Sequence, residues 1–391
     1  MKHRNLAEAT IAALQGVFAD GEVASRAVER TVAEHPKWGK RDRNEFSSAV
    51  YEIVRWRRLL EFAAGRGDEW SLLGAYLVRG HSDIPPWPEL ETLDAMGIAE
   101  RLNAPDLPRA LRQSVPDWLD ELGESQLGAR WDDELAALNR EAPVVLRANT
   151  LVASRDELAR ELLEAGLESK PIEGVPDALQ LAGRPKLNSL AAWKRGAFEV
   201  QDAASQLVAP FLLIEPGCNV VDACAGAGGK TLHLAALLRN EGKLLALDTS
   251  SAKLDELQRR ARRAGANVMT RVVDKPLLRD SRAFADRLLL DMPCSGSGTL
   301  RRQPDLKWRL SPEFLAQLQE RQRQILRDYC PMLRPAGLLV YATCSLFPSE
   351  NEQQIEAFVA DNPGFELEET RTISPAQTGF DGFWMARLRK K

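Results

Sequence analysis

The segment from residue 202 to residue 391 alternates short apolar runs with amphipathic stretches, and this pattern restricts the fold more than any other feature. The apolar runs predict strands at 219–223, 243–247, 268–273, 286–290 and 337–342. The intervening stretches have helical periodicity, at 229–239, 251–264, 312–330 and 349–361. Strands that alternate with helices form a parallel sheet covered on both faces, so an α/β domain is expected here.

A polar or reactive group follows each predicted strand. The first strand leads into a glycine-rich loop, the next three end at Asp248, Asp274 and Asp291, and the last leads into Thr343-Cys344-Ser345. In an open parallel sheet, ligands bind beyond the carboxyl ends of the strands. The sequence therefore predicts a single site built from all five strand ends.

The glycine-rich loop consists of Cys224, Ala225, Gly226, Ala227, Gly228, Gly229 and Lys230. Its glycines let a ligand approach the backbone, and the following helix offers free N–H groups. Gly-Gly-Lys-Thr resembles the end of a P-loop, but Cys224 stands where that motif needs its first glycine, which disfavours a nucleoside triphosphatase. Asp248 suits the paired hydroxyls of a ribose. Together these features favour a nucleoside cofactor such as S-adenosylmethionine, although the loop alone leaves a dinucleotide enzyme equally open.

Two cysteine motifs decide between these alternatives: Asp291-Met-Pro-Cys294-Ser-Gly-Ser-Gly and Thr-Cys344-Ser. Carbon 5 of cytosine is a poor nucleophile, and a thiolate that adds to carbon 6 makes it reactive toward a sulfonium methyl. A carboxyl group near ring nitrogen 3, such as Asp291, favours the addition. From this chemistry alone, either Cys294 or Cys344 could be the nucleophile. Cys218 and Cys330 are expected to be buried structural cysteines without a catalytic role.

These motifs resemble the RsmB/Sun family of RNA cytosine-5 methyltransferases, which is related to the Nop and NSUN enzymes. The resemblance covers residues 143–391, through LRANTL, FEVQDAASQLVAP, DACAGAGGKT, DMPCSGSGTLRRQPDLKW, YATCS and DGFWMARL. It implies a Rossmann-like class I methyltransferase domain at 202–391, with a mostly parallel sheet, preceded by a small α+β RNA-recognition subdomain at 141–201. It also implies S-adenosylmethionine as the cofactor and RNA as the partner.

The resemblance assigns roles to individual residues. Cys344 is implied to be the nucleophile, and Cys294 to assist release of the methylated product. Lys230 would orient Asp291 or the substrate, and Asp291 would face the target base. The loop 224–230 would hold the methionine part of the cofactor, Asp248 its ribose, and Asp274 would lie by its adenine. The family loop usually has a small residue and a proline where this chain has Gly226 and Ala227, and activity is expected to survive both changes.

The region 1–140 is predicted to be helical. Apolar residues recur at helical spacing at Leu6, Ile11, Leu14 and Val17, and Arg41-Asp42-Arg43 with the helical run that follows resembles a NusB-like RNA-binding domain. Residues 81–140 are rich in Pro and Trp and hold 13 Asp and Glu against five Arg. This acidic stretch matches no known pattern.

Charge and composition narrow the partners. The net charge of −4 argues weakly against binding nucleic acid by bulk electrostatics, but basic residues cluster beside the Cys294 motif. These four residues are predicted to contact phosphate: Arg301, Arg302, Lys307 and Arg309. No apolar stretch approaches the length of a membrane helix, no secretory signal is apparent, and no cysteine or histidine spacing suggests a metal site. A cytoplasmic monomer without metal is expected.

The predicted function is methylation of carbon 5 of a cytosine, with ribosomal RNA as the favoured substrate because of the NusB-like start. Transfer RNA is the alternative, and the substrate could be naked RNA or a partly assembled ribosomal particle. A DNA methyltransferase would use Cys294 as its nucleophile and would need a large recognition segment after the catalytic motifs. A non-catalytic assembly factor would be expected to have lost a catalytic cysteine or a cofactor-binding acid, and none is missing.

Overall fold

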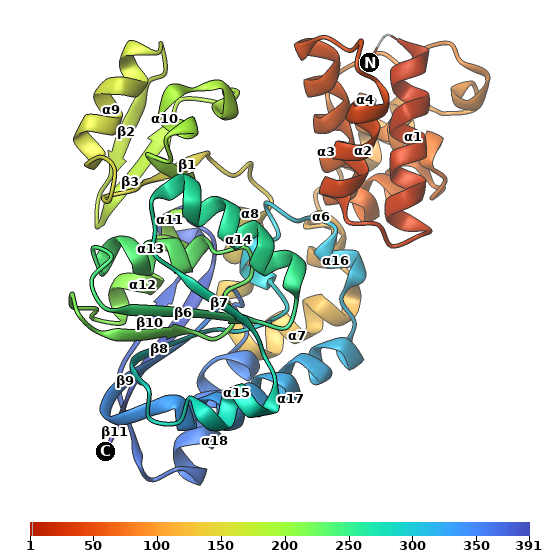
Figure 1. Ribbon diagram of the computed structural model, residues 1–391. Helices are drawn as coiled ribbons and strands as arrows, with labels where there is room; N and C mark the ends of the chain where they lie inside the picture. Colours follow the sequence, from red (N-terminus) through yellow and green to blue (C-terminus); the bar gives the residue numbers. More distant parts are fainter. Residues whose placement is uncertain (2) are drawn as a thin grey trace. The chain divides into compact units, whose positions relative to one another are not determined.

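The computed structural model describes residue 1 and residues 3–391, and contacts between residues divide them into two compact units. The helical unit comprises Met1–Glu141 together with Thr299–Pro312. The α/β unit comprises Ala142–Gly298 together with Glu313–Lys391. Each unit has its own hydrophobic core, and Figure 1 labels the helices and strands of both units. None of the helices in the described part of the chain is long and apolar enough to cross a membrane.

The α/β unit begins with a small four-stranded sheet in the order β2-β3-β1-β4. Its elements are β1 (Val145–Ala148), α9 (Arg155–Glu164), β2 (Ser169–Ile172), β3 (Val175–Leu181), α10 (Ala191–Lys194) and β4 (Phe198–Val200). Ser154 and Glu157 form a capping box that starts α9. The small α+β subdomain that the resemblance implies is present.

The large sheet has seven strands in the order β10-β11-β9-β8-β5-β6-β7. The five neighbouring strands from β9 to β7 are parallel to one another and correspond to the five predicted strands. These are β5 (Asn219–Asp222), β6 (Lys243–Asp248), β7 (Met269–Val272), β8 (Ala285–Asp291) and β9 (Leu333–Thr343). Two antiparallel strands extend the β9 edge: β10 (Phe365–Ile373) and β11 (Phe383–Lys390). The predicted Rossmann-like α/β architecture is confirmed.

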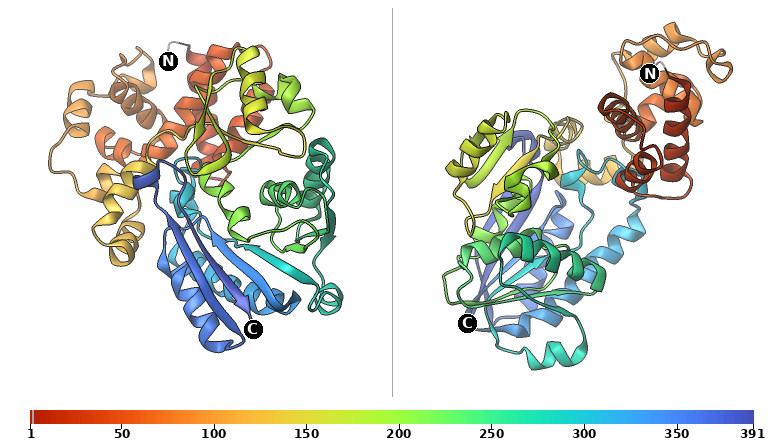
Figure 2. Two further views of the ribbon diagram at one scale, coloured as in Figure 1. Left: turned by 90° about the vertical axis from the view of Figure 1, so that its left-hand side faces the viewer. Right: turned by 45° about the horizontal axis from the view of Figure 1, so that its top comes forward.

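Helices cover both faces of the large sheet, as the alternating pattern predicts (Figures 1 and 2). Val220 of β5 packs with α12 and α13, whereas Val221 packs with α17 and α18. The helices of this region are α11 (Ala203–Gln206), α12 (Val208–Phe211), α13 (Gly229–Leu237), α14 (Ser251–Ala264), α15 (Lys275–Asp280), α17 (Pro312–Tyr329), α18 (Glu352–Asp361) and α19 (Pro375–Thr378). The strand order reverses between β5 and β8, so the carboxyl ends of these two strands flank the expected ligand crevice.

The helical unit is built around α3. Its helices are α1 (Arg4–Phe18), α2 (Ala24–Glu34), α3 (Lys40–Ala64), α4 (Glu69–Arg79), α5 (Ala95–Leu102), α6 (Arg109–Arg112), α7 (Asp117–Leu127), α8 (Arg130–Leu138) and α16 (Leu306–Arg309). The predicted core positions Leu6, Ile11, Leu14 and Val17 are all buried. The segment Thr299–Pro312 joins this unit, which the sequence analysis did not predict.

A kink in α3 explains why this segment is held. Trp56 has non-helical backbone angles, so the carbonyls of Val54 and Arg55 lose their helical partners. The indole Nε1 of Trp308 donates to the Val54 carbonyl (2.7 Å), and Nζ of Lys307 donates to the Arg55 carbonyl (3.2 Å). Buried backbone groups need such partners. The two side chains of α16 therefore complete the hydrogen bonding of α3.

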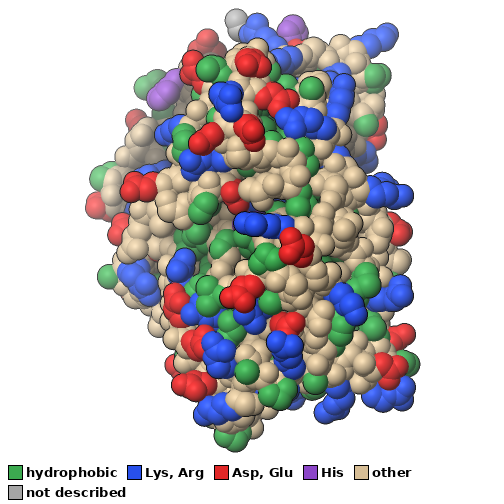
Figure 3. Space-filling view, turned by 60° about the vertical axis from the view of Figure 1, so that its left-hand side comes forward, with side chains coloured by type: hydrophobic (Ala, Val, Ile, Leu, Met, Phe, Trp, Pro, Cys, Tyr) green, Lys and Arg blue, Asp and Glu red, His purple; other side chains and the backbone are tan. Residues whose placement is uncertain are grey.

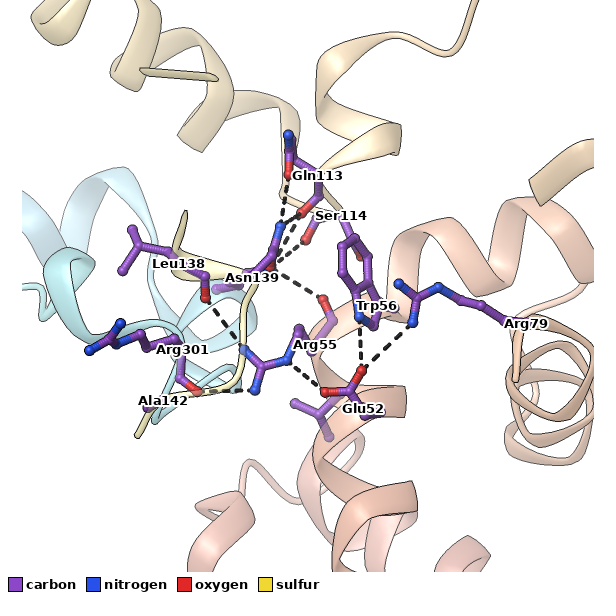
Figure 4. A network of polar contacts seen from close by, with 12 residues as sticks. Glu52, Arg55, Trp56, Arg79, Gln113, Ser114, Leu138, Asn139, Ala142 and Arg301 are labelled. Carbon is purple, nitrogen blue, oxygen red and sulfur yellow. Dashed lines mark hydrogen bonds and ion pairs between the residues drawn. The ribbon is translucent and has the colours of Figure 1, made fainter. Parts of the chain in front are cut away.

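Lys307 is fully buried and is surrounded by oxygen acceptors. Its Nζ also donates to Asn139 Oδ1 (2.7 Å) and to the carbonyls of Gln113 (3.3 Å) and Ser114 (3.2 Å). Figure 4 shows the surrounding polar network, in which Arg55 donates to the carbonyl of Arg301 (3.0 Å). Burial and then the charge of Arg55 lower the pKa of Lys307, and the four oxygen acceptors oppose that shift by favouring the ammonium.

We expect Lys307→Met to destabilise the helical unit by about 2 kcal/mol or more, because the buried Arg55 carbonyl and Asn139 lose their donor. Urea unfolding of the full chain, followed by tryptophan fluorescence, measures the change. The control is Lys37→Met, because Lys37 is exposed. If both variants had the same transition midpoint, the four contacts of Lys307 would contribute nothing measurable.

Candidate active site

Two thiols lie together at the carboxyl ends of neighbouring strands. Cys294 follows β8 and Cys344 follows β9, and their Sγ atoms are 3.3 Å apart. The pairing of β8 with β9 aligns Asp291 with Ala342, which brings the two cysteine-bearing loops side by side. The hydrogen bond to Cys344 and then burial raise the pKa of Cys294 well above its usual value. Cys294 therefore holds its proton at neutral pH.

A buried carboxylate fastens the two cysteine loops to each other. Glu350 is 0% exposed, and it accepts hydrogen bonds from both the backbone N–H and the hydroxyl of Ser295 (2.9 and 2.5 Å). It also accepts from the hydroxyl of Ser345 (2.6 Å) and from Gln322 Nε2 (3.0 Å). Because Ser295 follows Cys294 and Ser345 follows Cys344, one side chain sets the spacing of both thiols. Sequence reasoning missed Glu350.

The same loops are also joined through their backbones. Gly298 donates its N–H to the Cys344 carbonyl (2.9 Å), and its own carbonyl accepts from Gly382 (2.8 Å). A Cβ atom on Gly298 would lie 2.3 Å from the Gly382 carbonyl oxygen, so only glycine permits this approach. The Gly382 segment leads into β11. The last strand of the sheet is therefore part of the support for both cysteines.

Lys230 and Asp291 form an ion pair at the point where the strand order reverses. Lys230 Nζ lies 2.7 Å from Asp291 Oδ2, and the two side chains are 11% and 30% exposed. Burial lowers the pKa of Lys230, but attraction to Asp291 and their hydrogen bond outweigh it, so the pKa is raised. Behind the pair, burial raises the pKa of Asp222 to about 7, against the hydrogen bond from Thr231 that lowers it. The contact between Lys230 and Asp291 is the one that the resemblance implies for these two residues.

The glycine-rich loop makes a cradle beside this ion pair. Gly226 and Gly228 have φ angles of +55° and +91°, which favour glycine. A Cβ atom on Gly228 would lie 2.6 Å from Leu257 Cγ. Asp248 holds the loop by accepting from the Gly226 N–H (2.9 Å). The backbone of this cradle is partly exposed at Gly226, Ala227 and Gly229. Together with the Asp248 carboxylate at its edge, it fits the methionine and ribose parts of S-adenosylmethionine.

Asp274 and Cys224 were both predicted to bind the cofactor, and the structure gives each of them contacts within the protein. Asp274 is exposed and caps α15, where its Oδ1 accepts from the Leu277 N–H (2.7 Å). Burial raises the pKa of Cys224, which packs against the core of the large sheet. The role of Asp274 beside the adenine therefore stays a prediction. Among the described residues, no group of three or more His, Cys, Asp or Glu side chains could hold a metal ion.

Polar residues of the LRANTL motif on the small sheet form hydrogen bonds with the cradle and with the end of α14. Arg147 is only 1% exposed, and its Nη1 donates to the Gly229 carbonyl (2.7 Å) and to Gln201 Oε1 (2.5 Å). Asn149 Nδ2 donates to the carbonyl of Ala264 at the end of α14 (2.8 Å). In the sequence analysis this motif served only to support the resemblance to the family. The structure shows that its polar residues join the small sheet to the cradle.

The predicted basic cluster is not a phosphate-binding surface as a whole. Lys307 is fully buried and Arg301 is 5% exposed, so the prediction that they contact RNA is wrong for both. Lys307 instead donates to the Arg55 carbonyl at the kink of α3, and the backbone carbonyl of Arg301 accepts from Arg55. Arg302 is partly exposed, and Arg309 is exposed and ion-paired with Asp305 (2.9 Å). Only these two could reach a phosphate.

Comparison with known proteins agrees with this geometry. The family model described as 16S rRNA methyltransferase RsmB/F matches residues 210–389. The model of the ferredoxin-like domain of RsmF/B-like methyltransferases matches residues 115–188. Among solved structures, PH0851 superposes with a TM-score of 0.83 at 25% identity, over 98% of this chain and 99% of that chain. NSun6 from Pyrococcus horikoshii with SFG has the same fold, with a TM-score of 0.64 at 23% identity over 70% and 98% of the two chains.

Curated relatives are named as ribosomal RNA small subunit methyltransferases. The probable ribosomal RNA small subunit methyltransferase B of Synechocystis sp. is 36% identical over 298 residues, which cover 71% of this chain and 67% of that protein. The ribosomal RNA small subunit methyltransferase B of Klebsiella pneumoniae is 36% identical over 285 residues, which cover 71% and 66%. The chain thus spans about two thirds of the length of these relatives. It belongs to the RsmB/F family of 16S rRNA methyltransferases.

Proposed function

We propose that the protein transfers a methyl group from S-adenosylmethionine to carbon 5 of a cytosine in ribosomal RNA, with Cys344 as the covalent nucleophile. The observation that carries the proposal is the pair of thiols 3.3 Å apart beside the Lys230–Asp291 ion pair. One thiol must attack carbon 6 while a polar group faces the rest of the pyrimidine edge. This arrangement supplies both.

The cradle supports the cofactor assignment. Loop 224–230 would hold the methionine part, and Asp248 at the end of β6 would bind the ribose hydroxyls, with Asp274 near the adenine. Bound there, S-adenosylmethionine supplies an electrophilic methyl group on a sulfonium. Arg147 and Asp248 fix the loop before any ligand arrives, because each is hydrogen-bonded to loop backbone. Such preorganisation lowers the free-energy cost of binding.

The two thiols have different tasks. Cys294 keeps its proton and points its sulfur at Cys344, so it can stabilise the Cys344 thiolate by donating an S–H hydrogen bond. The Cys344 thiolate then forms a bond to carbon 6, and the electron pair of the 5,6 double bond shifts toward carbon 4, so that electrons move onto ring nitrogen 3 and carbon 5 becomes an enamine carbon. Asp291 at the end of β8 keeps 30% of its side chain exposed. It would face ring nitrogen 3 and accept a hydrogen bond from the proton that this nitrogen takes up from solvent. Lys230 keeps Asp291 in place.

Expulsion of Cys344 completes the reaction. Carbon 5 now carries the methyl group, whose former sulfonium sulfur is left as a neutral thioether, and ring nitrogen 3 releases its proton. Carbon 5 then loses its own proton to water, the electrons of that bond re-form the 5,6 double bond, and the bond between Cys344 and carbon 6 breaks. The leaving sulfur regains its electron pair beside the S–H of Cys294, which is how Cys294 assists product release. Without that donor, the covalent adduct should persist.

The substrate assignment follows the relatives, which are named as ribosomal RNA small subunit methyltransferases. Figure 3 shows side chains of both charges interspersed on one face of the molecule, so sequence-independent attraction to phosphate is modest there. A thiol can reach carbon 6 only when the base is unstacked. A loop or an assembly intermediate of ribosomal RNA is therefore the favoured substrate. The proposal places the reaction in the cytoplasm and takes the enzyme to be a monomer.

We expect Cys344→Ala to abolish transfer of tritiated methyl groups to unmodified ribosomal RNA, because no thiolate remains to add to carbon 6. Cys294→Ala should instead accumulate a covalent protein–RNA adduct, visible as a slow band in a denaturing gel. Cys218→Ala is the matched control and should keep wild-type activity, since Cys218 precedes β5 at the amino end of the strand, whereas both cysteine motifs follow the carboxyl ends of β8 and β9.

The opposite pattern would reverse the two thiols. If Cys344→Ala methylates while Cys294→Ala does not, the arrangement resembles that of DNA methyltransferases. Tritium label on transfer RNA alone would show that transfer RNA, and not ribosomal RNA, is the substrate. The absence of label on every RNA and on precursor particles would favour a non-catalytic assembly factor.

Glu350 provides a second test, because it should act as a positioning residue through the spacing of the two thiols. In Glu350→Gln the buried donors of Ser295 and Ser345 face an amide in place of a carboxylate. We expect kcat to fall at least about tenfold, equivalent to about 1.4 kcal/mol, while the Kd of S-adenosylmethionine stays unchanged. Glu356→Gln on the exposed face of α18 is the control. Equal kcat values for the two variants would show that the carboxylate does not position the thiols.

A further inference from the structure

A cavity of about 700 Å³ lies in the α/β unit between the small sheet and the helices that cover the large sheet. Val175, Pro176 and Asp177 of β3 line one side, and Pro210 of α12 with Leu237 of α13 lines another. None of its lining residues belongs to the site at the strand ends. Its volume is in the range of pockets that bind small ligands or single nucleotides. Figure 3 looks toward the side on which β3, α12 and α13 lie in Figure 1, and shows hydrophobic side chains in a hollow there.

Buried polar groups in this cavity lack partners. His233 is 2% exposed, and neither ring nitrogen has a hydrogen-bond partner within 3.5 Å among the described residues. Gln206 is 1% exposed and its Oε1 likewise has no partner within the described part of the chain, although its amide group donates to the Leu146 carbonyl. Buried polar atoms are nearly always hydrogen-bonded. Three such atoms beside one cavity point to a polar ligand.

The charges in the cavity define what that ligand must offer. Asp177 Oδ2 lies 3.6 Å from His233 Nε2, and its carboxylate accepts hydrogen bonds only. Burial, and then repulsion by Arg147, lower the pKa of His233 to about 4. Its imidazole is therefore neutral at pH 7, with one donor and one acceptor nitrogen. The exposed Arg239 at the edge adds a positive charge.

We propose that this cavity binds an unstacked guanine base of the RNA substrate, next to the target cytosine in the chain or in the folded RNA. The proposal rests on the proposed function, because that function makes RNA the ligand. The apolar walls would contact the faces of the base. Asp177 would accept from N1–H and the N2 amino group, His233 would donate to O6, and Arg239 would contact a phosphate.

Guanine is chosen because of its donor pattern. Among the four RNA bases, it alone presents two adjacent donors, N1–H and N2–H, on its Watson–Crick edge. Adenine and cytosine place a ring acceptor beside their amino group, and uracil places one N–H between two carbonyls. Each of these would bring a lone pair against the Asp177 carboxylate. Unpaired or repelled polar groups in a buried site give strong discrimination.

The position of the cavity suits a base that selects the substrate. His233 lies on α13, which begins at Gly229 of the cofactor cradle, and Arg147 joins the small sheet to the same residue. Sequence-specific RNA recognition relies on splayed bases that are hydrogen-bonded on their edges. A guanine held here would fix the RNA against the helix that carries the cradle. It would thereby set which cytosine reaches the thiols.

The test uses the full chain with histidines labelled with carbon-13, and titrates 5′-GMP, 5′-AMP, 5′-CMP and 5′-UMP. The chain has four histidines, so the His233 resonance is assigned by its loss in His233→Gln. We expect GMP to shift this resonance and to bind at least about tenfold more tightly than the other three nucleotides. Asp177→Asn should lose the preference, because it replaces one of the two acceptor oxygens by an amino group, which cannot accept from guanine. Asp156→Asn, an exposed position in the same small domain, is the matched control and should keep it.

Three results would overturn the proposal: equal binding of the four nucleotides, GMP binding that leaves the His233 resonance unmoved, or a GMP preference that survives in Asp177→Asn. Methyl transfer is measured on the same samples to separate the two proposals. Transfer to RNA without GMP selectivity refutes the guanine pocket alone. GMP selectivity without any methyl transfer refutes the proposed function and leaves the base-binding cavity standing.

Discussion

The buried carboxylate of Glu350 is the interaction on which the site most depends. Two loops from different strands each carry a cysteine, and short loops that end parallel strands have no intrinsic reason to agree in position to a few tenths of an ångström. Glu350 accepts from Ser295 and Ser345, the residues that follow the two thiols. A charged group in the core is tolerated because four donors surround it. The 3.3 Å separation of the sulfur atoms is a consequence.

A second constraint connects the cofactor cradle to the small sheet. Arg147 lies on β1 but donates to the backbone of the loop after β5. Glu199 of β4 in turn accepts from Arg260 and Arg263 of α14 (2.8 and 2.5 Å). These charged contacts are mostly buried, so breaking one leaves an uncompensated charge. The small sheet and the large sheet therefore position the cradle together, and neither alone determines its shape.

The sequence predicted those features that repeat locally. Apolar runs marked the five parallel strands, and the acids that follow them marked the rim, because both depend on neighbours in the chain. It could not predict β10, which is mostly exposed and lacks an apolar run. Lys307 was misread, because a lysine in a basic motif looks the same whether it faces phosphate or the open carbonyls of a kinked helix. Glu350 was missed because its partners lie up to 55 residues away.

The placement of β11 has a consequence for synthesis of the protein. This strand, Phe383–Lys390, is hydrogen-bonded between β9 and β10 rather than at an edge. Gly382 at its start holds the loop of Cys294. On the ribosome, both cysteines emerge long before the strand that supports them, and domains fold as units once their elements are available. The nascent chain therefore carries both thiols without their framework, and the arrangement of the two cysteine loops is completed only after β11 has emerged from the ribosome.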